Sequence, residues 1–205
     1  MHPLVAVVIA YLVGSIPSAY LAGRMARGID LRQHGSGNLG ATNLYRVLGW
    51  KYAVPVGLFD IAKGAIPVLL FAPQVSRSML YALACGVAAI IGHVFSVFVR
   101  FKGGKGVATA AGVMLALTPL ALGVAAAVWA IVLMLTGYVS LASIAAAAVL
   151  PLAVYLVERP ESPELLWVDG LIALGVIALH RRNIERLLKG TENRFGRRTA
   201  SAPRP

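Results

Sequence analysis

Two short segments rich in glycine and polar residues interrupt an otherwise apolar sequence: HGSGNLGATN, from His34, and FKGGKGVATAAG, from Phe101. Glycine lets backbone N–H groups approach a ligand, a helix N-terminus carries a partial positive charge, and lysine adds a full one. These groups together bind anions. Because both segments lie beside long apolar runs, the sequence predicts a site for phosphorylated substrates of lipid chemistry.

The first segment adds side chains that can hydrogen-bond a phosphate. They are Ser36, Asn38, Thr42 and Asn43. Gly35, Gly37 and Gly40 also match the dinucleotide fingerprint G-x-G-x-x-G. That motif must follow a β-strand, whereas an apolar run and a charged loop precede it here, so we reject the dinucleotide interpretation. A capped turn without a ligand remains the alternative to phosphate binding.

The second segment places Lys102 and Lys105 around Gly103, Gly104 and Gly106. It is not a Walker A motif, because Gly106 stands where a Ser or Thr must follow the lysine. Glycines flank Lys105 directly before a predicted helix, which favours anion binding. Lys102 is as well explained as a topological signal beside a membrane span.

Polar residues near the C-terminus form a third group, within HRRNIERLLKGTEN. His180 and Asn183 are spaced i,i+3 and share a helix face, which suits substrate contact or proton transfer. Glu192 either contacts substrate or organises the neighbouring arginines. Ser140, in the turn TGYVSLAS, either reaches the site or caps a helix.

Two charged residues lie inside an apolar run, Asp60 and Lys63. Charges at membrane depth are unfavourable unless paired or functional. Their i,i+3 spacing predicts a local ion pair that faces the bundle. The single cysteine, Cys85, excludes a disulfide within the chain and is expected to be buried.

Metal and cofactor chemistry finds no support in the sequence. The carboxylates predicted on the cytoplasmic side, Asp30, Glu185 and Glu192, form no clustered pair for Mg²⁺, which argues against CDP-alcohol phosphotransferase chemistry. No His and Cys set suits zinc, and the His-x4-Asp box of soluble acyltransferases is missing. We therefore predict no metal and no cofactor.

Composition places the chain in a membrane. Of 205 residues, 59% are hydrophobic and 13% charged, and the mean hydropathy is +0.78. Soluble domains are about 45–50% apolar. The net charge of +11 does not indicate nucleic-acid binding, because the basic residues lie in loops between apolar runs.

Apolar runs predict the helices, at about 4–23, 53–72, 79–99, 107–120, 121–136, 141–157 and 165–179. Residues 107–136 form either one long helix or two helices broken near Thr118–Pro119, each of about 15 residues and too short for the usual span; the distribution of charge decides between them. Sixteen of the 19 basic residues occupy the first loop, the third loop and the C-terminal segment. Seven helices put all sixteen on one side, which the positive-inside rule makes cytoplasmic. We predict an all-α bundle of seven transmembrane helices with the N-terminus outside. Residues 1–196 form one domain, followed by a basic, disordered tail at 197–205.

The three polar motifs resemble those of the bacterial membrane acyl-phosphate:glycerol-3-phosphate acyltransferases, the PlsY family. The similar stretches are GSIPSAYLAGR with HGSGNLGATNLYRVLG, GHVFSVFVRFKGGKGVATAAG, and HRRNIERLLKGTEN. The resemblance implies acyl transfer from acyl phosphate to the 1-hydroxyl of glycerol 3-phosphate in phospholipid synthesis, at the bacterial inner membrane. It implies membrane lipid as a partner, no obligate protein partner, and an active site facing the cytoplasm.

The resemblance also assigns roles by motif position. The residues around the acyl-phosphate group would be Ser36, Gly37, Asn38, Thr42 and Asn43. Those holding glycerol phosphate and the reaction centre would be Arg46, Lys105, His180 and Asn183. Lys102, Gly103, Gly104, Ser140 and Glu192 are further candidates for substrate binding.

An anion transporter or channel is the rival class, because it too uses small-residue helices and basic glycine-rich segments. It predicts inverted repeats and broken helices, and we recognise neither in the sequence.

Overall fold

The computed structural model describes residues 1–160 and 162–196, and within those ranges all regular structure is helical. The α-helices are α1 (Pro3–Ser15), α2 (Ser18–Arg27), α3 (Ala41–Leu48), α4 (Trp50–Ile66), α5 (Met79–Val94), α6 (Val107–Leu117), α7 (Pro119–Thr136), α8 (Val139–Ala153), α9 (Pro163–Leu179) and α10 (Arg181–Leu188). Short 3₁₀ or π turns are η1 (Leu31–Gln33), η2 (Pro67–Phe71), η3 (Ala72–Gln74), η4 (Val97–Val99) and η5 (Val154–Glu158). The tail predicted at 197–205 lies outside the described residues.

The chain is a multi-pass membrane protein. Within its described part, five stretches are long and apolar enough to cross a membrane: Pro3–Arg27, Trp50–Gln74, Met79–Val99, Pro119–Thr136 and Val139–Glu158. A sixth results if α9 and α10, which meet at 54°, count as one span. All seven predicted apolar runs are helical, but α6 has only 11 residues, about half of the length that crosses a bilayer. By length and composition, five or six stretches of the described residues can span a membrane, and the predicted count of seven is not confirmed.

The predicted break at Thr118–Pro119 is confirmed. α6 ends at Leu117, Thr118 leaves the helical conformation with φ −143°, and Pro119 begins α7. Proline disfavours helical backbone at the residue before it and is well tolerated in a first turn. The prediction of two short helices is wrong for the second, because α7 has 18 residues and reaches spanning length.

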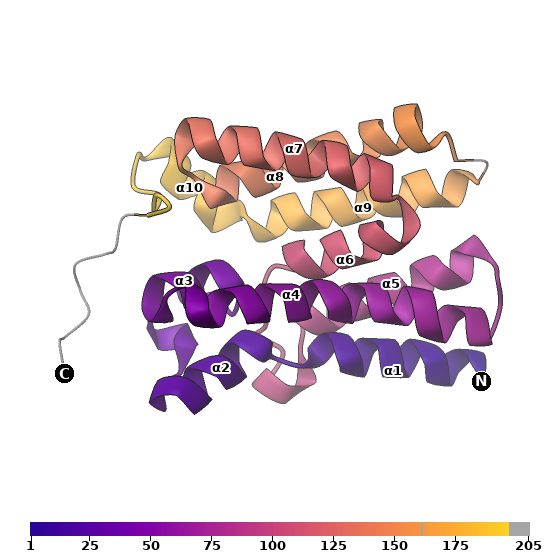
Figure 1. Cartoon of the computed structure of the whole chain (residues 1–205), viewed down its shortest axis with the longest axis horizontal. Coiled ribbons are helices and arrows are strands. Elements are labelled where there is room, and N and C mark those ends of the chain that lie inside the picture. The colour runs from indigo at the N-terminus through magenta and orange to yellow at the C-terminus, as the bar shows by residue number, and fades with distance from the viewer. Residues whose placement is uncertain (161, 197–205) are drawn as a thin grey trace.

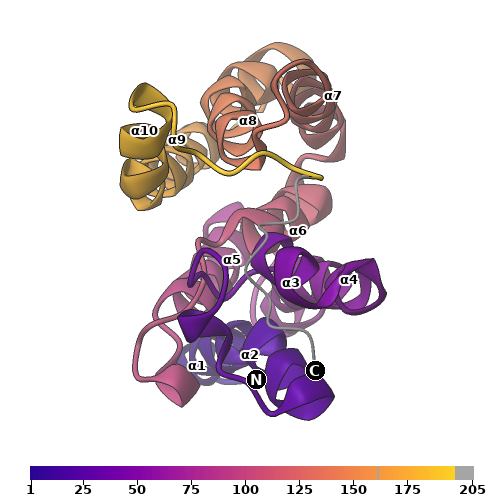
Figure 2. The same cartoon turned by 90° about the vertical axis from the view of Figure 1, so that its left-hand side faces the viewer.

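The helices form two layers that run along the long axis of the molecule (Figure 1). One layer holds α1 to α5 and the other α7 to α10, and the end-on view in Figure 2 shows α6 between them. Glycines allow the closest contacts. A Cβ at Gly14 of α1 would lie 2.1 Å from the Ala89 carbonyl oxygen of α5, and one at Gly112 of α6 would lie 1.9 Å from that of Ile61 in α4. Small residues at such contacts let helix backbones approach closely, as is common for helices in lipid.

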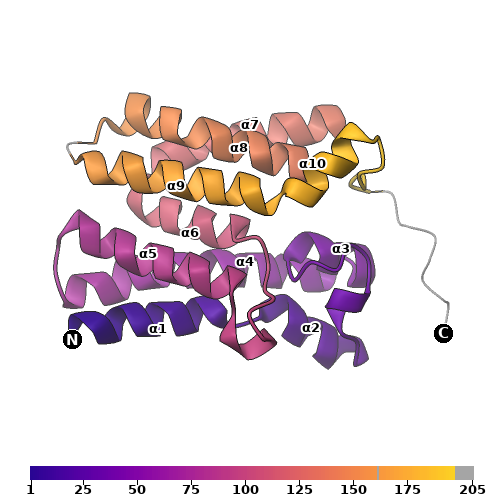
Figure 3. The same cartoon turned by 180° about the vertical axis from the view of Figure 1, so that it is seen from behind.

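Two interruptions within the bundle were not expected from the sequence. The first span breaks at Ile16–Pro17, between α1 and α2. α6 begins near the middle of the bundle instead of at its end, so the loop before it enters the interior (Figures 1 and 3). We took an absence of broken helices as an argument against a transporter. The structure does contain a broken helix, so this argument fails.

Candidate active site

A cavity of about 800 Å³ lies between the two layers and is lined by residues from both. All the side chains and glycines predicted for the site line it: Ser36, Gly37, Asn38, Thr42, Asn43, Arg46, Lys102, Gly103, Gly104, Lys105, Ser140, His180, Asn183 and Glu192. Three segments distant in the sequence thus converge on one cavity. The roles of the individual residues stay predictions.

The two ends of the cavity differ in character. Basic side chains line the polar end: Arg46, Lys102, Lys105, Arg181, Arg182 and Arg186. Asp60 and Glu192 are the carboxylates among the lining residues. The other end is apolar and lies between α7, α8 and α9, with Leu122, Trp129, Leu150 and Ile172 in its wall. Such a cavity suits a molecule with an anionic head and an apolar chain.

Asn43 organises the first polar loop. Its Oδ1 accepts the Ser36 N–H at 2.8 Å, and its Nδ2 donates to the carbonyls of His34 and Asn38, both at 3.0 Å. The side chain is buried, and its amide is occupied by the loop. Asn43 therefore holds the loop in shape, and the surfaces left for a ligand belong to its neighbours Ser36 and Asn38.

The second polar loop uses its glycines differently from the prediction. The N–H groups of Gly103 and Gly104 donate to the carbonyls of Val94 and His93 at the end of α5, at 3.0 and 3.1 Å. These N–H groups are thus occupied by the protein, whereas we expected them to face an anion. The first turn of α6, which begins at Val107 beside Lys105, presents N–H groups that lack partners within the helix. The helix N-terminus, and not the two glycines, therefore has N–H groups of the kind that can bind an anion.

Lys105 reaches from this loop to the other layer, where its ammonium donates to the Asn183 amide oxygen. Burial lowers the pKa of Lys105 to about 8, and the positive charges of Arg186 and Arg46 add to the effect, while Glu192 opposes it. The ammonium is therefore incompletely compensated. The negative charge of a bound phosphate would compensate the positive charge of Lys105.

His180 lies at the corner between α9 and α10, just past the end of the span. Its Nδ1 lies 2.7 Å from the Val176 carbonyl oxygen, and because a carbonyl only accepts, this contact places the proton on Nδ1. Burial lowers the pKa of His180 to about 4, with Lys105 contributing. At neutral pH the ring is uncharged, and its Nε2 is a hydrogen-bond acceptor of low basicity.

Glu192 joins the third motif to α8. Its carboxylate accepts from Ser140 at 3.0 Å, from Asn183 at 2.8 Å and from Arg186 at 2.6 Å. Burial by itself raises the pKa of Glu192, but these hydrogen bonds and the Arg186 charge outweigh it and keep the pKa below its usual value. Glu192 thus organises an arginine, as one of our two interpretations predicted. The Ser140 hydroxyl is directed to this network.

The segment after α10 ties the two layers together at the polar end (Figure 2). The Phe195 N–H donates to the Gly137 carbonyl at 2.7 Å, and its ring stacks on Tyr45 with centroids 4.8 Å apart. Tyr45 precedes Arg46, whose Nε is buried without a hydrogen-bond partner among the described residues. Arg46 therefore retains a donor that an anionic ligand can satisfy.

Sequence reasoning missed several polar residues that line the cavity, which include Asp60, His93, Arg181, Arg182 and Arg186. Arg186 follows Asn183 by three positions on α10, so the helical period could have identified it. Asp60 and Lys63 form the predicted buried ion pair, at 2.7 Å, but their position behind the second loop depends on tertiary packing. Cys85 is buried, as predicted.

Comparisons with known proteins agree with this geometry. The family described as Glycerol-3-phosphate acyltransferase matches residues 4–190. A glycerol-3-phosphate acyltransferase of Trichlorobacter lovleyi is 52% identical over 186 residues, which cover 91% of this chain and 94% of that protein. The one from Chlorobaculum parvum is 43% identical and covers 96% of this chain and 98% of its own length.

Solved structures share the fold. The crystal structure of PlsY (YgiH), an integral membrane glycerol 3-phosphate acyltransferase, in its glycerol 3-phosphate form superposes with a TM-score of 0.85. Its sequence is 40% identical, and the match covers 95% of this chain and 96% of that one. The lysophosphatidic acid form gives a TM-score of 0.86. These similarities do not favour an anion transporter or channel.

Proposed function

The chain belongs to the glycerol-3-phosphate acyltransferase family, and we propose that it transfers a fatty acyl group from acyl phosphate to the 1-hydroxyl of glycerol 3-phosphate. The products are lysophosphatidate and inorganic phosphate. The observation that carries the proposal is a cavity lined by basic side chains at one end and by apolar side chains at the other, which suits phosphate groups beside an acyl chain.

Glycerol 3-phosphate binds at the basic end, between the layers. Lys105 and Arg46 pair with its phosphate, since the first is a partly desolvated ammonium and the second has an unsatisfied buried Nε. His180 and Asn183 hold the glycerol hydroxyls near the reaction centre. The interaction of two full charges with a phosphate in a partly dry site is stronger than in water.

The acyl-phosphate group lies against the first polar loop, close to Ser36, Gly37, Asn38 and Thr42. Asn43 keeps that loop in its binding shape through its hydrogen bonds to backbone groups. The second loop completes the wall of this part of the cavity with Lys102, Gly103 and Gly104. Glu192 accepts hydrogen bonds from Ser140 and Arg186 and thereby holds Arg186 in place. The acyl chain extends into the apolar end, between helices and towards lipid.

The chemical step needs little acid or base assistance. The substrate hydroxyl attacks the acyl carbonyl carbon, a new C–O ester bond forms, and the bond between that carbon and the phosphate oxygen breaks. Phosphate leaves readily, so the main requirement is to stabilise the oxyanion and to hold two anions together, which Lys105 and its neighbours supply. The hydroxyl proton passes to a phosphate oxygen, because His180 with a pKa of about 4 is a weak base.

The proposal includes topology and location. Residues 1–196 form one acyltransferase domain of the bacterial inner membrane, with the N-terminus outside and the active site at the cytoplasm. Support comes from the convergence of three basic segments on one cavity and from the course of α6, which begins near the middle of the bundle and leads towards the end opposite the polar loops (Figure 1). Leu120, just after it, contacts Glu158 there. α6 and the loop that enters the bundle thus serve together as the seventh crossing.

Donor and acceptor comparison tests the proposal. Protein purified in detergent is given acyl phosphate, acyl-CoA or acyl carrier protein as donor, each with glycerol 3-phosphate or with glycerol. We expect lysophosphatidate only with acyl phosphate and glycerol 3-phosphate. Comparable rates with acyl-CoA or acyl carrier protein would overturn the assignment of acyl phosphate as the donor. Comparable rates with glycerol would show that the basic end of the cavity does not select the acceptor by its phosphate.

A further inference from the structure

A buried polar cluster lies behind the second polar loop, within the apolar bundle. Asp60 and Lys63 of α4 form its ion pair, with side chains only 1% and 2% exposed. Lys63 also donates to the Ile16 carbonyl at 2.9 Å, and the Ser18 hydroxyl donates to Asp60 at 2.6 Å. The cluster therefore ties α4 to the break between α1 and α2.

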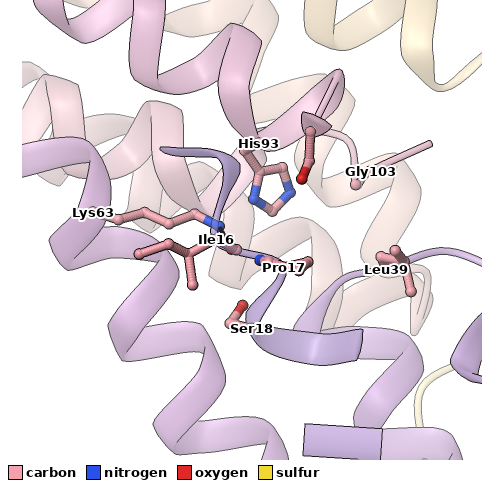
Figure 4. Close-up of a pocket in the computed structure, with 9 residues that line it drawn as sticks. Ile16, Pro17, Ser18, Leu39, Lys63, His93 and Gly103 are labelled. Carbon is pink, nitrogen blue, oxygen red and sulfur yellow. Dashed lines mark hydrogen bonds between the residues drawn. The ribbon is translucent and has the colours of Figure 1, made fainter. Parts of the chain in front are cut away.

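His93, near the end of α5, connects this cluster to the loop. In Figure 4 the His93 ring lies between Lys63 and Ile16 on one side and Gly103 on the other. The ring Nδ1 lies 3.8 Å from Asp60 Oδ1, and a cavity of about 10 Å³, about the size of one water, lies among Lys63, His93 and Gly104. His93 is the residue that contacts both the ion pair and the glycine loop.

The backbone of the loop packs closely against His93. A Cβ at Gly103 would lie 2.0 Å from the His93 carbonyl oxygen, and a Cβ at Gly104 would lie 2.1 Å from His93 Nε2. The Gly104 N–H donates to the same carbonyl at 3.1 Å. Lys105 follows directly in the chain, so the place of its ammonium depends on the place of this ring.

We propose that Asp60, Lys63 and His93 are positioning residues, which fix the Gly103–Gly104 backbone and thereby place the Lys105 ammonium on the substrate phosphate. The inference rests on the role proposed for Lys105. An ion pair buried at membrane depth is a poor source of stability compared with apolar packing. Holding a catalytic loop in one place explains why these charges lie where they do.

Asp60 and His93 also line the large cavity, so direct contact with substrate is the competing explanation. A double-mutant cycle separates the two, because residues that act through Lys105 lose their effect when Lys105 is gone. The proteins are wild type, His93→Ala, Lys105→Ala and the double variant. His93→Ala leaves no unpaired buried charge. A second variant, Asp60→Asn with Lys63→Met, replaces the ion pair by neutral side chains and tests the same positioning of the loop.

Leu83→Ala is the matched control. Leu83 is buried in the same helix α5, belongs to an apolar cluster with Val113 and Met114, and does not line the cavity. For each protein we measure kcat/KM at saturating acyl phosphate, glycerol 3-phosphate binding by calorimetry, and the thermal unfolding midpoint in detergent.

Positioning predicts that His93→Ala lowers kcat/KM roughly 10- to 100-fold when Lys105 is present and less than about 3-fold in the Lys105→Ala protein. Leu83→Ala lowers the thermal unfolding midpoint but does not lower kcat/KM to this extent. Equal losses in both backgrounds would show direct substrate contact and overturn the proposal. An unchanged kcat/KM in His93→Ala and in the neutral pair would also overturn it.

The calorimetric measurement keeps this inference separate from the proposed function. If wild type shows no turnover with acyl phosphate, the proposed donor fails. Positioning still predicts weaker glycerol 3-phosphate binding in His93→Ala only while Lys105 is present. Weakening that is independent of Lys105 contradicts positioning whatever the donor is.

Discussion

Removal of the Lys105 ammonium is the substitution with the largest expected effect on catalysis. The side chain extends from the loop before α6 to Asn183 of α10 and so joins the two layers at the cavity. Burial lowers its pKa to about 8, which shows an ammonium with incomplete solvation and incomplete pairing. Lys105→Ala removes this charge from the basic end of the cavity, where we propose that the two substrate phosphates bind.

The magnitude follows from the kind of interaction that Lys105 makes with substrate. With a pKa of about 8, the ammonium is mostly charged at pH 7. One charge-assisted hydrogen bond to a phosphate or oxyanion in a partly dry site contributes about 2–4 kcal/mol. Lys105→Ala should therefore lower kcat/KM by about 30- to 1000-fold. A rise in KM alone indicates ground-state binding of phosphate, and a fall in kcat indicates stabilisation of the transition state.

Steady-state kinetics in detergent, with glycerol 3-phosphate varied, measure this decrease. Lys51→Ala is the matched control, because Lys51 is exposed at the start of α4, carries the same charge and does not line the cavity. We expect Lys51→Ala to retain wild-type kcat/KM. A folded Lys105→Ala protein with less than a threefold decrease (about 0.7 kcal/mol) would refute the electrostatic role of Lys105.

Three further predictions concern pH, the base and the topology. Because the pKa of Lys105 is lowered to about 8, its charge is present below that pH and lost above it, so kcat/KM should fall as pH rises past 8, and Lys105→Ala should lose this limb. His180→Gln should keep more than about a tenth of the wild-type kcat, because phosphate oxygens accept the proton; a loss beyond 100-fold with unchanged glycerol 3-phosphate binding would make His180 the base. Single cysteines at Ser36, Lys105 and His180, in a Cys85→Ala background, should resist an impermeant reagent outside intact cells, and labelling of any of them would contradict the cytoplasmic site.

The helices and some members of the site were predictable from local patterns in the sequence, whereas others, such as Arg46, were assigned only through the resemblance to a known family. Apolar runs located the membrane helices, and Pro119 located the break before α7. Glycine and lysine beside a helix start marked Lys105 as a cavity residue. These signals are local, because helix length, proline and capping depend on neighbouring residues.

What the sequence did not reveal depends on contacts between distant segments. The Asn43 amide looked available for a ligand, but three backbone groups of its own loop occupy it. The Gly103 and Gly104 N–H groups looked available too, but they bond to the end of α5. Spacing gives the residues that can meet, whereas the fold decides which polar groups remain free for a substrate.

Product stoichiometry in the purified protein tests direct acyl transfer most directly. Acyl phosphate and glycerol 3-phosphate are supplied without CoA or carrier protein, and lysophosphatidate and inorganic phosphate are followed together. We predict that both appear in equal amounts, only when glycerol 3-phosphate is present, and far more slowly with Lys105→Ala. Phosphate release at the same rate without the acceptor, or no lysophosphatidate from acyl phosphate, would contradict direct transfer.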